Sequence, residues 1–245
     1  IKILIKKFPI SSKMSYLIAI GTSVCGATAI VATAPVINAK KTEIAYAIAN
    51  ITLFGVIAMI AYPHFAEWYF DNNDLKAGLF LGTSIHETSQ VAAAGLIYDQ
   101  QFNSPETLNV STVTKLIRNT FLVIMIPCIA FLYNKGNVKG KAYSILNIFP
   151  YFVIGFIGMI LFRNLGDQIF LNESQNYIIW TNIIDYLKIS ATVFLTMAMA
   201  AVGISINLSE LKLMGLRPFV VGLIAAITVG LISIIYIEIF YKIFV

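Results

Sequence analysis

The chain has 245 residues, of which 58% are apolar and only 12% are charged, and its mean hydropathy is +0.82. Soluble globular domains are about half apolar and a quarter charged, so this composition excludes an ordinary water-soluble domain. The net charge of +5 comes from basic residues that lie between apolar blocks and form no continuous stripe, which indicates membrane topology and not nucleic-acid binding.

Apolar blocks of about the length of a membrane-spanning helix follow one another along the chain. The run 121–126 is continuously apolar, which excludes the alternating pattern of a membrane barrel, so we expect every block to be a helix. Short connections predict one transmembrane domain over residues 1–245, and the missing initiator methionine predicts that N-terminal spans of a longer protein are lacking. The expected helices cover residues 16–37, 44–62, 75–98, 116–133, 148–162, 186–206 and 219–241.

The charged loops test how these segments cross the membrane, because Lys and Arg stay preferentially on the cytoplasmic side. If all segments cross, Lys40 and Lys41 fall opposite the basic N-terminus. If the first and third segments instead return to the side from which they entered, every basic loop is cytoplasmic and every acidic loop is external. The second arrangement fits the charges better. The basic loops are 1–13, 38–41, 134–141 and 208–217, and the acidic loops are 63–74, 99–114 and 164–185.

The first and third segments also carry small and polar residues at mid-membrane and share the letters Gly-Thr-Ser, as in a weak internal repeat. Glycines in 21–35 and 82–95 lower helix propensity, so both stretches are expected to unwind and to offer freed backbone groups to an anion. The alternative is that small residues only permit close helix packing. The expected substrate contacts are Thr22, Ser23, Cys25, Gly26, Thr28, Thr83, Ser84, Thr88 and Gln90.

His86 and Glu87 are an adjacent ionisable pair inside an apolar segment, where a charge costs at least a few kcal/mol. We expect them to couple transport to protons or sodium, with Glu87 on the same helix face as Thr83 and Gln90. The alternative is that they only hydrogen-bond neighbouring helices or lie near an interface. Lys115 and Arg118 are expected to anchor the fourth segment by extending to the membrane surface.

No enzymatic chemistry is expected from this sequence. His86 and Glu87 begin like a zinc-protease motif, but Gln90 occupies the place of its second histidine. We find no glycine-rich phosphate loop and no nucleophile–base–acid set, so the prediction includes no catalytic residue, no metal site and no cofactor.

Several stretches together resemble the YeiH-like (UPF0324) family of bacterial membrane proteins, to which sulfate export is ascribed. The resemblance implies inverted repeats, discontinuous helices and a distant relation to cation/proton antiporters and bile-acid symporters. The family usually has Asp at Glu87 and Ser at Thr28, and its members are longer, with further spans before Gly21. The matching stretches are 25–37, 45–55, Gly82-Thr-Ser-Ile-His-Glu-Thr-Ser-Gln-Val91 and 198–205.

The sequence therefore predicts an all-α, polytopic transmembrane helical bundle with discontinuous or re-entrant helices and inverted repeats. The expected function is secondary transport of a small anion, sulfate or a sulfonate, coupled to protons or sodium, in a multi-pass protein of the bacterial plasma membrane. Its expected partners are the anion, the coupling ion and the lipid bilayer, and homo-oligomerisation is left open. A channel or receptor-like protein without ion coupling is the alternative, and a membrane-embedded enzyme is less favoured.

Overall fold

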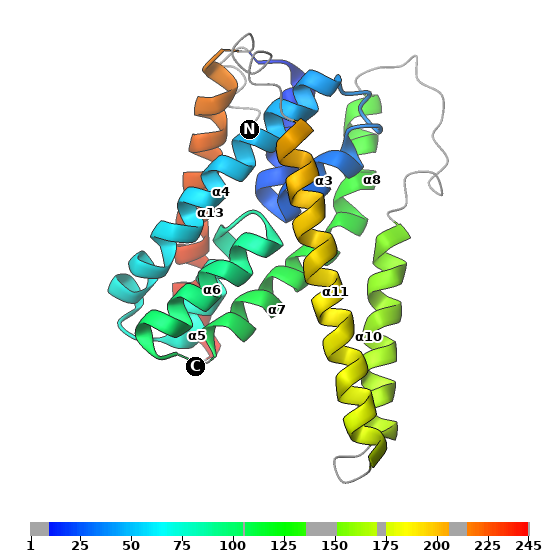
Figure 1. The fold of residues 1–245 in the computed structure, drawn as a ribbon. Helices are drawn as coiled ribbons and strands as arrows, with labels where there is room; N and C mark the ends of the chain where they lie inside the picture. The colour runs from blue at the N-terminus through cyan, green and yellow to red at the C-terminus, as the bar shows by residue number, and fades with distance from the viewer. Residues whose placement is uncertain (1–9, 105, 136–150, 171–174, 206–214, 245) are drawn as a thin grey trace. The chain divides into compact units, whose positions relative to one another are not determined.

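The computed structural model describes residues 10–104, 106–135, 151–170, 175–205 and 215–244, and every regular element within them is a helix (Figure 1). Four helical stretches are long and apolar enough to cross a bilayer, namely Ser12–Thr33, Lys41–Phe70, Thr107–Tyr133 and Arg217–Ile243. The prediction of an all-α polytopic membrane protein is confirmed. The contacts divide the chain into two compact units, Ile1–Ile148 with Ile206–Val245, and Phe149–Ser205.

The first predicted segment is a broken hairpin and not one straight helix. It consists of α2 (Ser12–Ile20), the π-helix η1 (Gly21–Cys25) and α3 (Gly26–Thr33). Its two ends lie together, because Lys13 Nζ donates to the carbonyl oxygen of Asn38 at 2.5 Å and Ser11 Oγ donates to Glu43 Oε1 at 2.5 Å. The segment therefore returns to the end of the molecule at which it began.

Helix α4 (Lys41–Phe70) then runs from this end to the opposite one. Glu43 accepts a hydrogen bond from the Lys40 backbone N–H at 2.9 Å, which pairs one of the free amides at the helix start. The helix ends where Asp71 takes a left-handed conformation with φ of 52°, a conformation in which Asp and Asn are favoured among non-glycine residues.

The third predicted segment is a second broken hairpin, formed by α5 (Asp74–Ser84) and α6 (Thr88–Phe102). The Tyr98 hydroxyl donates to Glu67 Oε2 at 2.5 Å, which ties the end of α6 to the end of α4. The Thr107 hydroxyl donates to the Asp74 carbonyl oxygen at 3.2 Å, so the chain beyond α6 lies beside the start of α5. The second hairpin thus enters and leaves at the end opposite to the first.

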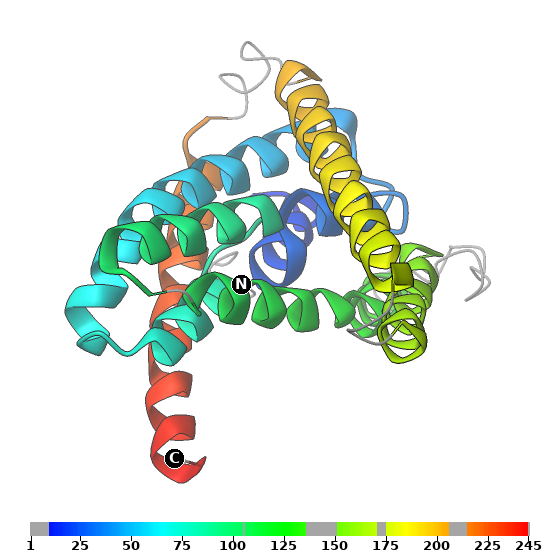
Figure 2. The ribbon, with the colours of Figure 1, turned by 60° about the horizontal axis from the view of Figure 1, so that its bottom comes forward.

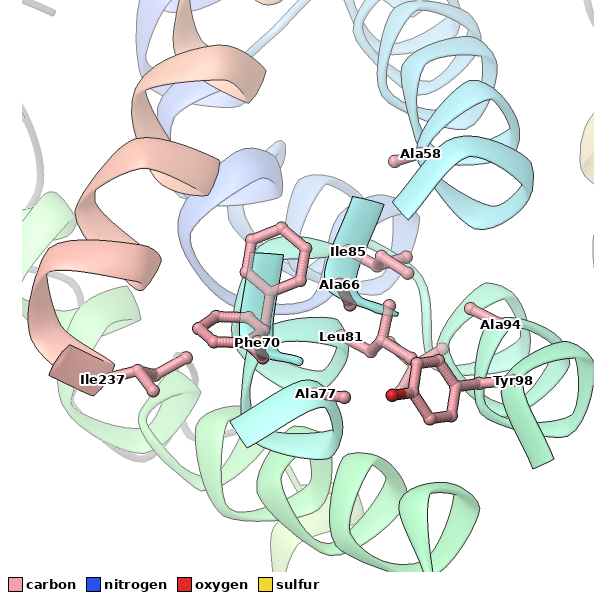
Figure 3. Packing of buried hydrophobic residues seen from close by; sticks show 11 residues of the cluster. Ala58, Ala66, Phe70, Ala77, Leu81, Ile85, Ala94, Tyr98 and Ile237 are labelled. Carbon is pink, nitrogen blue, oxygen red and sulfur yellow. The ribbon is translucent and has the colours of Figure 1, made fainter. Parts of the chain in front are cut away.

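A compact apolar cluster holds the second hairpin against its neighbours. Figure 3 shows Phe70 from α4, Leu81 from α5 and Tyr98 from α6 turned toward one another, with Ile237 from α13 at the edge. Leu81 and Tyr98 are fully buried, and in lipid, which is itself apolar, such contacts stabilise the helices through van der Waals packing.

Three further helices complete this unit: α7 (Thr107–Thr120), α8 (Leu122–Lys135) and α13 (Arg217–Phe244). The ring of Tyr133 at the end of α8 meets that of Tyr16 in α2 edge-on at 5.9 Å, so α7 and α8 together lead back to the first end. Helix α13 spans the unit, since the Tyr46 hydroxyl donates to Gly215 O at 2.8 Å near its start. Near its end, Asn73 Nδ2 donates to the Tyr241 hydroxyl at 3.1 Å.

Two hairpins that enter from opposite ends are the arrangement that the charged loops favoured. Lys13 and Lys40 lie at one end, and Glu67 and Asp74 lie at the other. The inverted repeat is therefore one broken hairpin from each end, seen from two directions in Figures 1 and 2.

The second unit consists of α10 (Tyr151–Ile169) and α11 (Gln175–Ser205). Asp167 of α10 joins the two helices near their connection, because it accepts a hydrogen bond from Trp180 Nε1 of α11 at 2.7 Å. It also accepts from Arg163 Nε of its own helix at 2.7 Å. Both helices correspond to predicted segments, but residues 148–150 and 206 of those predictions lie outside the described residues.

Candidate substrate and coupling site at the hairpin tips

The tips of the two hairpins meet inside the first unit. The carboxylate of Glu87, at the tip of the second hairpin, accepts a hydrogen bond from the Ala27 N–H in the first turn of α3. Gly26 begins α3 with φ of 55° and ψ of −128°, a conformation that is nearly restricted to glycine. A Cβ atom at this position would overlap the Glu87 carboxylate. The contact between the tips therefore requires a residue without a side chain.

The second break has no glycine. Ile85 and Glu87 are extended, with ψ of 146° and 143°, and they separate α5 from α6. The expectation that Gly82 and Gly95 cause the break is wrong, because both lie inside helices. Gly82 packs against Ser111 and Gly95 packs against Leu108, so these glycines permit close packing on α7, which was the alternative interpretation of the small residues.

This break also overturns the predicted common helix face. Thr83 belongs to α5 and Gln90 to α6, whereas Glu87 caps the start of α6. Because no continuous helix joins them, the spacing of three and four residues does not place these side chains on one face.

Lys115 of α7 binds the backbone of both breaks. Its ammonium donates to Val24 O at 2.9 Å, to Ile85 O at 3.0 Å and to His86 O. The side chain is fully buried, and its three donors are all used. It therefore satisfies carbonyl groups that the interrupted helices leave without a helical partner.

Arg118, one turn further along α7, has the same role. Its Nε donates to Ser23 O at 2.8 Å and its Nη2 donates to Thr22 O in the first hairpin. Its Nη1 donates to Thr83 O at 2.6 Å and Ile85 O at 3.0 Å in the second. The expectation that Lys115 and Arg118 extend to the membrane surface is wrong, because both turn inward to the hairpin tips.

The charges at the tips do not balance among the described residues. Lys115 and Arg118 bring two positive charges, whereas Glu87 brings one negative charge and His86 is buried beside it in the chain. The first turn of α3 adds partial positive charge, since the amides at a helix start point out of the helix. The site therefore carries net positive charge when all three ionisable groups are charged.

Most of the predicted contact residues lie around the tips, but their hydroxyls are already bonded. Thr22 Oγ1 donates to Ile18 O at 2.6 Å, Thr83 Oγ1 to Leu79 O at 2.6 Å, and Ser84 Oγ to Phe80 O at 2.5 Å. Each bond runs back to the residue's own helix, which is common for Ser and Thr in helices. At Thr22, Ser23 and Thr83 it is the backbone carbonyl that faces the arginine.

The other predicted residues divide into two groups. The Cys25 thiol lies within hydrogen-bonding reach of the Thr28 and Thr88 hydroxyls, and Thr28 is exposed. The Thr88 hydroxyl also accepts from Asn119 Nδ2 at 3.2 Å. Gln90 is turned away toward α4, where its Nε2 donates to Thr52 O at 3.1 Å.

Three buried polar atoms near these groups have no hydrogen-bond partner within the described part of the chain: His86 Nδ1, Gln90 Oε1 and Asn119 Oδ1. Unpaired buried polar atoms are uncommon in proteins and call for an explanation such as a ligand or a functional state. His86 and Asn119 thus add unused polar capacity close to the second tip.

Sequence reasoning missed the two cations that join the breaks. A signal was present, because Lys115 and Arg118 lie within one helical turn, and Lys115 precedes an apolar segment that continues to Tyr133. Cations near a segment end are usually assigned to the membrane surface. Only the three-dimensional structure shows that α7 begins at Thr107, nine residues before the predicted start of this segment at Leu116, and carries both residues inward.

Comparison with known sequences gives a consistent picture. Residues 1–222 match the family described as Conserved hypothetical protein 698. A UPF0324 membrane protein of Fusobacterium nucleatum is 34% identical over 95% of this chain and 68% of its own length. A UPF0324 membrane protein of Streptococcus agalactiae is 35% identical, with coverages of 94% and 65%. The UPF0324 inner membrane protein YeiH of Salmonella typhimurium is 31% identical, with coverages of 89% and 58%.

The chain thus spans between 58% and 68% of the length of these relatives. No solved structure matches it.

Proposed function

The chain belongs to the family of Conserved hypothetical protein 698 and to the UPF0324 membrane proteins. From this premise we propose that it is a secondary transporter of a small anion. It is a multi-pass protein of the bacterial cell membrane, in keeping with its helices and with the inner-membrane relative. The proposed transport site is the meeting point of the two hairpin tips.

One observation carries this proposal: two inward-facing cations, Lys115 and Arg118, and a single carboxylate, Glu87, all bond to the backbone of the two hairpin tips. Uncompensated charge is expensive inside a membrane and usually marks a substrate or ion pathway. A small anion that enters the site would supply the missing negative charge. The amides of a half-helix start, here that of α3, are a common way for transporters to hold anionic groups.

The chemistry of these donors favours an oxyanion. Lys115 and Arg118 direct their N–H groups to backbone carbonyls, so they would attract an anion through their positive charge, whereas the backbone amides at the start of α3 are directional donors suited to the oxygens of an oxyanion. Sulfate or a sulfonate is therefore the proposed substrate class, and protons or sodium are the proposed coupling ions, with His86 and Glu87 as the coupling residues. The hydrogen bond from Ala27 to Glu87 links the coupling residue directly to the amides that an anion would use.

Transport into reconstituted vesicles tests this function. Purified protein should give saturable movement of sulfate or a sulfonate that responds to an imposed proton or sodium gradient. Glu87→Gln should retain binding of the anion but lose the response to the gradient, because the amide cannot lose or gain a proton in the working range. Glu106→Gln is the matched control, since this exposed residue precedes α7 and should leave the coupling unchanged.

Two outcomes would contradict the proposal. Flux that ignores both gradients and survives Glu87→Gln would indicate a channel. Absence of binding and flux for every small anion tested, with chemical change of a lipid or peptide instead, would indicate a membrane enzyme.

A further inference from the structure

The Lys115 ammonium has surroundings that resemble a cation-binding site more than an ion pair. Its three bonds go to the backbone carbonyl oxygens of Val24, Ile85 and His86. Within the described residues, the ion pairs join Lys76 with Glu238, Arg163 with Asp167 and Lys188 with Asp185, and none includes Lys115. A buried lysine usually gains its compensation from a carboxylate, so this all-carbonyl arrangement needs its own explanation.

The carbonyls come from both hairpins. Val24 lies in the π-helix of the first hairpin, whereas Ile85 and His86 lie in the non-helical tip of the second. In discontinuous membrane helices, freed carbonyls of this kind coordinate the ion that drives transport, commonly sodium. Here the ammonium of α7 occupies the position at which such an ion would bridge the two breaks.

We propose that Lys115 is a tethered cation that takes the place of a bound sodium ion between the hairpin tips, and so determines that the coupling ion is the proton. The statement about coupling rests on the proposed transport function, whereas the statement about the tethered cation does not. Arg118 supports the same arrangement by bonding the neighbouring carbonyls of Thr22, Ser23 and Thr83.

The first consequence concerns the wild-type protein and needs no variant. Because its carbonyl site is already filled, replacing all sodium by potassium or choline at constant ionic strength should leave the Tm of the purified protein unchanged. A Tm that rises with sodium concentration, and does not rise with the same concentration of choline, would overturn the tethered-cation proposal.

The second consequence concerns the ammonium itself. Lys115→Met keeps most of the side-chain volume but removes the ammonium donor from the buried carbonyls of Val24 and His86, whereas Ile85 O keeps its bond from Arg118, so the Tm should fall by about 10 °C. Lys242→Met is the matched control, since Lys242 is exposed in the last turn of α13 and its loss should leave the Tm unchanged. A Lys115→Met protein as stable as wild type would contradict the proposal.

A chemical rescue separates the bridging role from simple packing. Lys115→Ala removes three methylenes and the ammonium, and propylammonium ion has the same atoms. Propylammonium should raise the Tm of Lys115→Ala but not that of wild type, whereas tetramethylammonium, which has charge but no N–H donor, should have no effect. Equal effects of the two ions would show that no hydrogen-bonding cation site exists.

The coupling statement is tested in vesicles with sulfate as the probe. Wild-type flux should respond to a proton gradient and be unaffected by a sodium gradient. Sodium-driven flux would overturn the assignment of the proton while leaving anion transport intact. Absence of any flux would contradict the proposed function, and the Tm measurements would still decide whether Lys115 is the tethered cation.

Discussion

The two hairpins solve the same structural problem in different ways. In the first, the chain turns at Gly26, whose positive φ follows a π-helix of five residues. In the second, the chain turns through the three non-helical residues from Ile85 to Glu87, and none of them is a glycine. Both tips then bond to the same two cations, Lys115 and Arg118.

This difference shows that a break in a membrane helix can depend on a residue at the break itself or on residues that lie far away in the sequence. Gly26 makes the first break inexpensive by tolerating a conformation that other residues avoid. Both breaks use donors from α7, because unsatisfied carbonyls in hydrocarbon cost several kcal/mol each, but only the first break also has a glycine at its turn. Both hairpins should therefore be sensitive to changes in α7, and the first should in addition be sensitive to a side chain at Gly26.

The largest effect is expected from Gly26→Ala. The added Cβ would overlap Glu87 and would also force alanine into a positive-φ conformation, at a combined cost of about 3 kcal/mol or more. Thermal unfolding of the purified protein should show a large fall in Tm together with loss of anion binding. Gly155→Ala is the matched control, since nothing lies within 4 Å of a Cβ there and alanine should be neutral or slightly stabilising. Equal Tm values for the two variants would contradict the inference that the first break requires a glycine at position 26.

A smaller effect is expected from Tyr98→Phe at the base of the second hairpin. Tyr98 is fully buried and its hydroxyl donates to Glu67 at 2.5 Å, and a hydrogen bond to a charged group contributes about 1.5–3 kcal/mol. The Tm should therefore fall by several degrees, and hydrogen exchange should rise in α6. Tyr236→Phe, at an exposed tyrosine of α13, should change neither. Unaltered exchange in α6 would mean that this contact does not hold the hairpin.

The smallest effect is expected from Lys13→Met at the base of the first hairpin. Lys13 donates to Asn38 O at 2.5 Å, but this bond is exposed to solvent, so its loss should cost about 0.5 kcal/mol or less. The Tm should remain within about 2 °C of wild type. A fall in Tm as large as that of Tyr98→Phe would show that the first hairpin is also held from its base and not mainly at its tip.

Composition and block length were enough to predict an all-α membrane bundle, and the charged loops favoured the two returning segments that the structure contains. The family resemblance is confirmed. The glycines of 21–35 predicted a break in the first segment, which the structure places at Gly26. The same reasoning failed for the position of the second break, because the residues that stabilise Ile85 to Glu87 lie some 30 positions away on α7. Contacts over that sequence distance leave no periodic signal.

The candidate site was predicted in part. Gly26 and Glu87 were selected from the sequence, and they meet at the tips. The selected hydroxyls of Thr22 and Ser84 instead bond to the preceding turn, and that of Thr83 bonds to the preceding turn and to the Ser233 hydroxyl of α13. Residue type alone could not distinguish a hydroxyl that faces a ligand from one that bonds to the preceding turn, because both occur in small-residue helices.

The length of α4 has a consequence for the choice of lipid. Its 30 residues extend about 45 Å, whereas the hydrocarbon layer measures about 30 Å. A tilt of about 40° still leaves a surplus, so the last turns must project among the lipid headgroups, where Trp68, 77% exposed, is well suited. Glu67 lies in this overhang and holds the second hairpin through Tyr98. We therefore expect the acyl-chain length of the lipid to affect how firmly the second hairpin, which carries Glu87, is held in place.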